Sequence, residues 1–445
     1  MNQNVAYPGQ SQHRGLRFTA AELLVIAVVV CCFFQNIVAL LAFNVEPSMT
    51  IPVLAAKDVL LFLGIAYFGL KAVLKRRLAR SQLLGLLLLG GMGALWLLQG
   101  ANNLVEFRLL ITPNVLLCFG LLIAPYVRPQ KVARSVLWLL ALVIVLGIIE
   151  RFFLYSPTEE FWDWLNLSDF MIQRDATITH LTGPLGRTPA SFYTSDFIAL
   201  SGFEGSRPRR FITLNYFDAL VFAHALAFAC VYLLIRRRWA LYAGSLAILV
   251  MTLGKGGLLV TYLASGIAFA KTTSSGFLRR VVMVLSIVSV IAWILSAYFV
   301  INSTAMVKHV DGIASGITSL ATHPLGQGVG EGGNRALREA ISEMGRESAE
   351  EMNLGAESFI GSALVQVGLL ALATFSALIY IAFRLMKSRR PEYLACGTVL
   401  IGTLFASLLS ESAISYTGSG FVFILAGIMF VNESLSADPV TESTS

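Results

Sequence analysis

The sequence predicts an all-α polytopic membrane protein, from its composition and from the spacing of its apolar runs. Of the 445 residues, 56% are hydrophobic and 13% are charged, and the mean hydropathy is +0.73. A water-soluble globule needs a larger charged fraction to cover its surface. A helix needs about 20 apolar residues to cross a bilayer, and runs of about that length recur from end to end. These observations exclude an ordinary soluble domain.

We expect about twelve transmembrane helices, separated by polar or glycine-containing segments. They are predicted at residues 21–43, 51–70, 83–98, 109–127, 135–153, 211–235, 240–253, 256–270, 281–301, 357–383, 394–409 and 421–431. The polar residues 1–17 precede a full-length span rather than the short apolar core of a cleavable signal peptide. The first helix is therefore expected to remain as a membrane anchor.

Basic residues predict the orientation of these helices. If the N-terminus lies in the cytoplasm, the inward connections carry 20 of the 33 Lys and Arg residues. Short cytoplasmic loops are enriched in Lys and Arg, so both termini are expected in the cytoplasm of a bacterium and the protein in its inner membrane. The net charge of +7 is then explained by topology and by contact with anionic lipid. The basic residues form no aromatic-interleaved patch of the kind that binds nucleic acid.

This orientation divides the chain into helical blocks and two long periplasmic loops. The expected order is helices 1–5 in residues 1–153, a first loop at 154–210, helices 6–9 at 211–301, a second loop at 302–356, helices 10–12 at 357–431 and a disordered cytoplasmic tail at 432–445. Charge in a bilayer protein is placed where water, a pore or a substrate accommodates it. The two loops and the helix ends beside them are therefore the expected location of the chemistry.

The first loop ends in a cluster of guanidinium groups, and a lysine lies at a later glycine-rich break. Arg207, Arg209 and Arg210 immediately precede a span on the outer side, against the trend of the other basic residues. Their planar forks suit phosphate, and pairing with acidic residues or lipid phosphates is the alternative. Lys255 lies between two short apolar segments and is flanked by glycines. It is interpreted either as an anion-binding residue at a helix start or as a snorkelling lysine.

The second loop contains a glycine-rich turn at residues 323–333, then a polar stretch at 334–352. The turn lies outside any strand–turn–helix unit, so a dinucleotide-binding motif is excluded by its context. It is interpreted as a turn that lets the backbone approach a ligand, with ordinary loop flexibility as the alternative. The polar stretch predicts a solvated surface helix with opposite charges at helical spacing. Arg338 within it and His323 before it are retained as candidates.

Four further charged residues lie near the ends of predicted spans. Glu357 begins a long apolar run, where a half-buried carboxylate with a raised pKa can act as a general base. The alternative is an acidic residue that favours the helix N-terminus. Lys57 and Asp58, adjacent in the second span, are interpreted as a structural pair or a pore-lining polar spot, and Arg108 as a snorkelling residue.

Four short stretches resemble, in order and in topology, the O-antigen polymerase and ligase superfamily of bacterial envelope enzymes. They are Arg210 with Leu214, Asn215 and Tyr216; Gly254, Lys255, Gly256 and Gly257; the run from His323 through Pro324, Leu325 and Gly326 to Gly330; and Glu357 with Ser358, followed by Gly368. The stretches are similar to the family's Arg before an Asn-containing helix start, its Ser-Arg-Gly turn, its Pro-Leu-x-Gly-x-Gly turn and its His-Asn pair. This chain departs from the family at Lys255, where the family has Arg, and at Glu357, where its ligases have His.

The resemblance implies a GT-C-like glycosyltransferase at the periplasmic face that needs no metal and no cofactor. It implies undecaprenyl-pyrophosphate-linked glycans as substrates, with a chain-length regulator and a flippase as partners. Arg209, Arg210, Lys255 and Arg338 would hold the pyrophosphate, and Glu357, or His323 in its place, would be the catalytic base. Since Glu357 replaces the ligase histidine, a repeat-unit polymerase is favoured over a ligase that transfers glycan to lipid A-core or protein. A lipid-linked oligosaccharide flippase is the alternative from another class.

Overall fold

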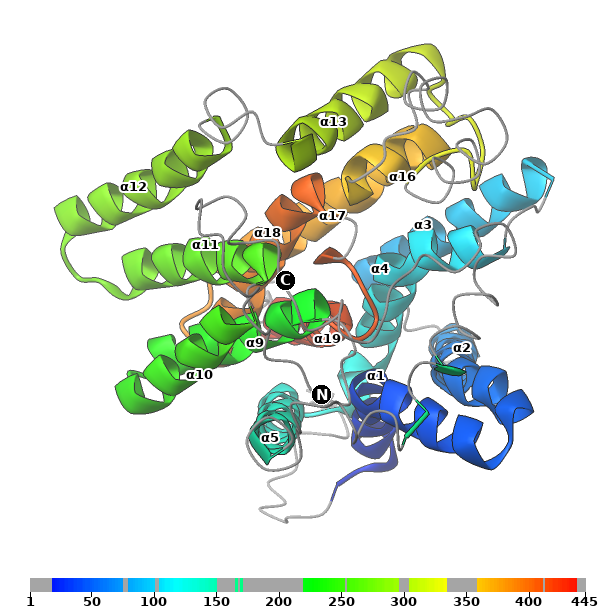
Figure 1. The fold of residues 1–445 in the computed structure, drawn as a ribbon, viewed down its shortest axis with the longest axis horizontal. Helices are drawn as coiled ribbons and strands as arrows, with labels where there is room; N and C mark the ends of the chain where they lie inside the picture. The colour runs from blue at the N-terminus through cyan, green and yellow to red at the C-terminus, as the bar shows by residue number, and fades with distance from the viewer. Residues whose placement is uncertain are drawn as a thin grey trace, which may run out of the picture.

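The structure, a computed structural model, describes residues 18–74, 79–100, 104–149, 165–166, 169–170, 219–252, 254–295, 304–333, 358–410 and 413–437. These residues form helices joined by turns, and no strand occurs among them (Figure 1). The fold is therefore the all-helical one that the sequence predicts. The helices are α1 (Ala20–Val45), η1 (Pro47–Met49), α2 (Thr50–Leu74), α3 (Arg80–Leu98), α4 (Leu104–Ile123), η2 (Ala124–Tyr126), α5 (Pro129–Ile149), α9 (Ala219–Ile235), α10 (Trp239–Met251), α11 (Lys255–Thr272), α12 (Gly276–Leu295), α13 (Thr304–Thr322), α16 (Phe359–Val367), α17 (Leu369–Leu385), α18 (Pro391–Leu409) and α19 (Gly420–Ala437).

Many of these helices have the length and apolarity of membrane spans. In the described part of the chain, six stretches are long and apolar enough to cross a bilayer: Ala20–Val45, Pro47–Leu74, Arg80–Leu98, Glu106–Tyr126, Pro129–Ile149 and Pro391–Leu409. Four shorter apolar helices accompany them, at Val221–Ile235, Trp239–Met251, Leu369–Leu385 and Gly420–Ser434. The chain is thus compatible with a polytopic membrane protein. The count of twelve spans stays a prediction.

The centre of the bundle is built from α4, α18 and α19. The apolar windows of α4 and α18 are 89% and 83% buried, whereas that of α3 is 22% buried. Gly120 of α4 lies against the backbone of Ile424 in α19, so these two helices are in close contact. α9 and α11 pack on α18 from one side, α2 packs on α4 on the other, and α1 packs on α2 and α5 (Figure 1). The peripheral helices expose apolar side chains, as lipid-facing helices do.

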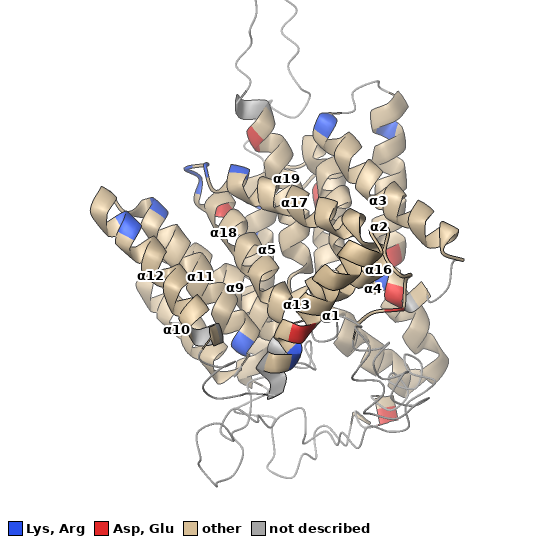
Figure 2. Cartoon of the chain, turned by 90° about the horizontal axis from the view of Figure 1, so that it is seen from above, with Lys and Arg blue, Asp and Glu red and all other residues tan. Residues whose placement is uncertain are grey.

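Basic residues gather at one end of the helices. Figure 2 shows most of the described Lys and Arg positions at that end, which we call the basic end; the other is the opposite end. The helix ends and turns concerned carry Lys71, Arg80, Arg128, Lys131, Arg236, Arg237, Arg238, Lys271, Arg279, Arg280, Arg384, Lys387, Arg389 and Arg390. This one-sided distribution is the pattern from which the orientation is predicted. Which compartment each end faces stays a prediction.

A buried carboxylate ties the start of α1 to the α4–α5 turn at the basic end. Glu22 is fully buried and accepts hydrogen bonds from the backbone N–H of Thr19 (3.0 Å) and from Arg128, through the backbone N–H (3.2 Å), Nε (2.6 Å) and Nη2 (2.8 Å). The Lys131 ammonium lies 3.6 Å from the same carboxylate. The hydrogen bond to Glu22 raises the pKa of the Arg128 guanidinium. The carboxylate therefore satisfies donors from two separate segments.

Replacing Glu22 with alanine is expected to lower the free energy of unfolding by about 2 kcal/mol, because two backbone N–H groups and the Arg128 guanidinium lose their acceptor. The loss is moderated because the Arg128 side chain is 39% exposed and regains water. The matched control is Glu46→Ala, since Glu46 is exposed and its carboxylate accepts a described hydrogen bond from the Ser48 hydroxyl. Thermal unfolding in detergent should show a lower midpoint for Glu22→Ala alone. Equal midpoints for the two variants would contradict this role.

The structure departs from the predicted elements at three places. The predicted span 357–383 is two helices, α16 and α17, which meet at Gly368. Within the predicted loop 302–356, residues 304–322 form α13, which packs along α16 through Gly312, Gly316 and Gly361. α19 extends to Ala437, beyond the predicted start of the tail at residue 432. Nδ2 of Asn432 in this helix donates to the carbonyls of Ile428 (2.8 Å) and Ala124 (3.3 Å). The second hydrogen bond attaches α19 to η2.

Candidate functional site

Lys255 begins α11 at the opposite end, as the glycine-rich break predicts. α10 ends at Met251, the Thr252 hydroxyl accepts from the backbone N–H of Gly254 (3.1 Å), and Gly254 is the N-cap of α11. Gly254 has no side chain with which to cap this N-terminus. Its first N–H groups are directed out of the helix at its positive end, the geometry that favours an anion. The Lys255 side chain is exposed beside them.

His224 of α9 lies directly against this helix start and was not among the predicted residues. Its imidazole is 2% exposed, and a Cβ built on Gly256 would lie 2.8 Å from its Nε2. Its Nδ1 is buried and has no hydrogen-bond partner among the described residues. A single histidine inside an apolar run gives no periodic signal, which is why sequence reasoning missed it. It is close enough to Gly256 to orient the start of α11.

The glycine-rich turn at 323–333 docks on the junction between α16 and α17, and we call it the glycine clasp. The backbone N–H of Leu369 donates to the Pro324 carbonyl, and that of Gln327 donates to the Val365 carbonyl, both at 2.8 Å. Gly326 and Gly368 have φ values of +85° and +53°, which disfavour other residues. A Cβ at Gly326 would collide with the Gln366 carbonyl, and one at Gly368 with that of Pro324. The glycines thus allow backbone to approach backbone.

Two glutamine side chains fasten the clasp. Gln366 is 2% exposed; its Oε1 accepts from the N–H of Gly330 (3.1 Å), and its Nε2 donates to the Gly332 carbonyl (3.2 Å) and the Ser362 hydroxyl (2.8 Å). Gln99, at the end of α3, accepts from the N–H of Val329 at 3.2 Å. The polar groups of this turn are therefore bonded to α16, to α17 and to the end of α3.

His323 lies at the exposed edge of the clasp. It directly follows α13; its backbone N–H donates to the Ser319 carbonyl (2.6 Å), and its Nδ1 is 3.0 Å from the Thr322 hydroxyl. The imidazole is exposed, so it is open to a ligand from outside. Its carbonyl accepts from the backbone N–H of Gly326 at 2.8 Å, so the described contacts of His323 lie at the end of α13 and within the clasp.

Four of the predicted site residues lie outside the described residues: Arg209, Arg210, Arg338 and Glu357. Ser358, which follows Glu357, is fully buried and caps α16 by accepting from the N–H of Gly361 at 3.0 Å. Ala219, the first described residue after Arg210 in the chain, starts α9 at the opposite end. The described neighbours of Arg210 and Glu357 thus belong to the same end of the helices as Lys255 and the clasp.

α18 is the common neighbour of these elements. α9, α11, α13 and α16 all pack against it. The helices that carry His224 and Lys255, and two helices that adjoin the clasp, therefore all contact one central helix. Cationic and N–H groups of this kind bind anions such as phosphate. No group of three His, Cys, Asp or Glu in the described part of the chain is placed to hold a metal ion.

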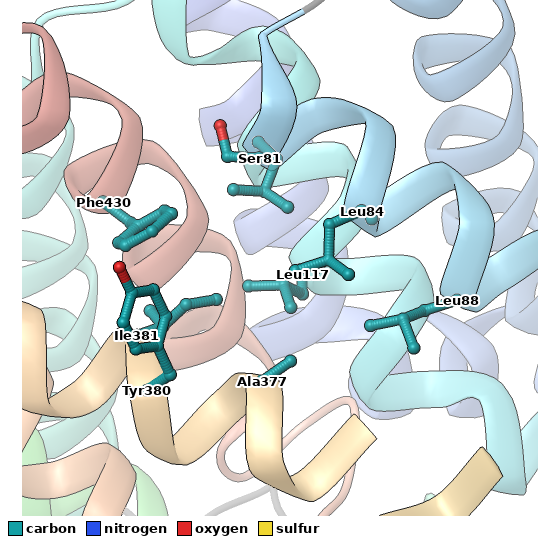
Figure 3. Close-up of a pocket in the computed structure, with 10 residues that line it drawn as sticks. Ser81, Leu84, Leu88, Leu117, Ala377, Tyr380, Ile381 and Phe430 are labelled. Atoms are coloured by element: carbon teal, nitrogen blue, oxygen red, sulfur yellow. The ribbon is translucent and has the colours of Figure 1, made fainter. Parts of the chain in front are cut away.

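An apolar crevice between α3, α4, α17 and α19 lies away from these residues, near the basic end. Figure 3 shows Leu84, Leu88 and Leu117 facing Ile381 and Phe430 across it, with the hydroxyls of Ser81 and Tyr380 at its edge. It contains no charged side chain. A crevice of this composition suits hydrocarbon rather than a polar substrate.

No protein-family model matches this chain, and no curated protein matches it.

Proposed function

We propose that this protein is a bacterial inner-membrane glycosyltransferase that polymerises undecaprenyl-pyrophosphate-linked repeat units at the periplasmic face. The proposal rests on the four stretches that resemble the O-antigen polymerase and ligase superfamily. The observation that supports it best is the clasp. Two of these stretches, at Pro324–Gly330 and at Gly368, are distant in sequence yet bonded backbone to backbone. A third, at Lys255, starts a helix that shares α18 as a neighbour with them.

In the proposed reaction, the growing glycan on undecaprenyl pyrophosphate is the donor and a lipid-linked repeat unit is the acceptor. Glu357 takes the proton from the acceptor hydroxyl, whose oxygen forms a bond to the anomeric carbon of the donor with inversion. The bond between that carbon and the pyrophosphate oxygen breaks, and the pyrophosphate leaves with the electron pair. Arg209, Arg210 and Lys255 stabilise the charge that develops on it, and Arg338 contributes a further phosphate or sugar contact.

A ligase would use the same donor site, so the acceptor distinguishes the two activities. Glu357 stands where ligases of the family carry histidine, and this favours the polymerase. The Lys255 ammonium keeps the positive charge of the family's arginine but lacks its bidentate fork. A flippase would concentrate its charges along a central cavity, whereas this chain concentrates candidate charges at the periplasmic helix ends and loops.

The glycan profile of a strain lacking this gene tests the proposal. A polymerase predicts that long chains disappear while single repeat units are still attached to their final carrier. A ligase predicts that all attached glycan disappears while lipid-linked polymer accumulates. A flippase predicts that single lipid-linked repeat units accumulate on the cytoplasmic side. An unchanged profile would contradict all three.

A further inference from the structure

A second charged cluster lies between α2, α4 and the segment that precedes α19. The carboxylate of Asp58 is 2.8 Å from Nη2 of Arg108 and 3.5 Å from Nζ of Lys57. Nζ of Lys57 also donates to the Leu54 carbonyl at 2.9 Å and lies 4.8 Å from the centre of the Tyr416 ring. The Arg108 guanidinium lies 5.7 Å from the same ring. The pair predicted from sequence is therefore part of a larger cluster built from three segments.

The described ion pairs of this cluster join unequal numbers of basic and acidic groups. The basic groups of Lys57 and Arg108 both pair with the single carboxylate of Asp58. The Lys57 and Asp58 side chains are 3% and 16% exposed, while that of Arg108 is 42% exposed. An uncompensated charge inside a helix bundle is costly and commonly marks a site that receives a counter-charge. One bound monovalent anion would therefore equalise the positive and negative charges of the cluster.

Two buried atoms of the cluster also lack a hydrogen-bond partner among the described residues: Nε of Arg108, a donor, and Oδ1 of Asp58, an acceptor. Leaving such groups unpaired costs free energy, so a ligand that satisfies both is favoured. The ligand must accept from Arg108 and donate to Asp58. Burial, followed by the charge of Asp58, raises the pKa of Tyr416, so its phenol stays neutral and adds no second negative charge. A phosphate monoanion that keeps one O–H group meets all three requirements.

The cluster lies at a depth that a lipid phosphate reaches from the side. Lys57 is seven residues after the start of α2 and Arg108 four residues after the start of α4, so they lie about 10 Å and 6 Å along their helices from the opposite end. Next to Asp58, the exposed side chains of α2 are apolar: Val59, Phe62 and Leu63. α2 is at the edge of the bundle (Figure 1). An acyl chain can lie along this face while its phosphate meets the partly exposed Arg108.

We propose that Lys57, Asp58 and Arg108 form a binding site for a singly protonated phosphate monoester, carried by a membrane lipid. Lys57 and Arg108 donate to the phosphate oxygens, and Oδ1 of Asp58 accepts from the phosphate O–H. A phosphodiester has no such O–H and leaves that oxygen unpaired. The proposal rests on this cluster and not on the glycosyltransferase function, so either can fail without the other.

The test compares two anionic lipids that differ in this one group. Phosphatidic acid is a monoester with a phosphate O–H near pH 6, whereas phosphatidylmethanol is a diester without it. Binding of each to the full-length protein in phosphatidylcholine nanodiscs is measured by native mass spectrometry. Wild-type protein should prefer phosphatidic acid by about tenfold or more, the effect of a hydrogen bond to a charged group. Lys57→Met should weaken binding of both lipids, and Asp58→Asn should abolish the preference.

Controls separate the site from general attraction to anionic lipid. Lys71 lies on the same helix at the basic end, where its Nζ is 4.2 Å from the centre of the Tyr126 ring. The control variant Lys71→Met should therefore keep the preference for phosphatidic acid. Lys57→Arg keeps the positive charge and should keep lipid binding. This variant still tests the site if Lys57→Met does not fold. If inorganic phosphate binds in place of the lipid, free phosphate is the source of the anion, and the assignment of the binding site to these residues is retained. Equal affinity of wild-type protein for both lipids, or an unaltered preference in Asp58→Asn, would overturn the proposal.

Discussion

Replacing Glu357 with glutamine is expected to reduce the proposed chain extension by about 10²–10⁴-fold, because the acceptor hydroxyl loses its proposed general base while the size of the side chain is kept. The measurement is the rate at which lipid-linked repeat units are joined by purified protein, or the length of the glycan ladder in cells. Arg210→Ala should reduce the same rate by about 10²–10³-fold, because it removes a cation proposed to stabilise the leaving pyrophosphate.

The matched control is Glu343→Gln, which removes a carboxylate from the predicted solvated helix at 334–352 and should leave the rate unchanged. The pH profile distinguishes a base from a structural carboxylate. The wild-type rate should fall as pH falls through the pKa of the base, and the residual rate of Glu357→Gln should lose that dependence. If Glu357→Gln and Arg210→Ala both leave chain length unaltered, the assigned site is wrong, and His323→Gln becomes the variant to measure.

Gly326→Ala is expected to lower the free energy of unfolding by about 2–4 kcal/mol and to abolish activity in the same preparation. An added Cβ meets the Gln366 carbonyl, and a φ of +85° is strained for alanine. Gly368→Ala should act through the same contact from its other side, at the Pro324 carbonyl. Both variants detach the clasp from the α16–α17 junction. The measurements are thermal unfolding in detergent and the chain-extension assay.

Gly90→Ala provides the control for these two substitutions. Gly90 lies inside α3 with nothing near the position of an added Cβ, so alanine there should raise helix stability by about 1 kcal/mol. The double variant Gly326→Ala and Gly368→Ala should cost less than the sum of the single variants, because both break one contact. Midpoints of unfolding in Gly326→Ala equal to wild type would show that the clasp does not hold these helices together.

The helices could be predicted from sequence because apolar runs and their polar boundaries are local signals. Each predicted span contains a described helix, from α1 to α19. The break at Gly368 could not be read, since the run from Phe359 to Leu385 is apolar on both sides of it. The break depends on the clasp, which reaches Gly368 from residues more than 35 positions earlier in the chain. A contact of that kind leaves no periodic trace.

The candidate site was predictable where a residue type is unusual for its place. Lys255 stands out because a charge beside glycines interrupts an apolar run, and the structure puts it at a helix start. His224 did not stand out, because its role depends on the approach of Gly256 from another helix. Lys57 and Asp58 were recognised as a pair, but Arg108 and Tyr416 join them only through tertiary packing. The charge imbalance follows from that packing.

The central claim, that this protein joins lipid-linked repeat units, is tested most directly with purified protein in proteoliposomes. Undecaprenyl-pyrophosphate-linked repeat units are supplied as the sole substrate, and products are separated by size. The account predicts a ladder of longer lipid-linked glycans with release of undecaprenyl pyrophosphate, lost in Glu357→Gln and retained in Glu343→Gln. Movement of intact single units across the bilayer with no ladder, or a ladder of equal rate in Glu357→Gln, would contradict it.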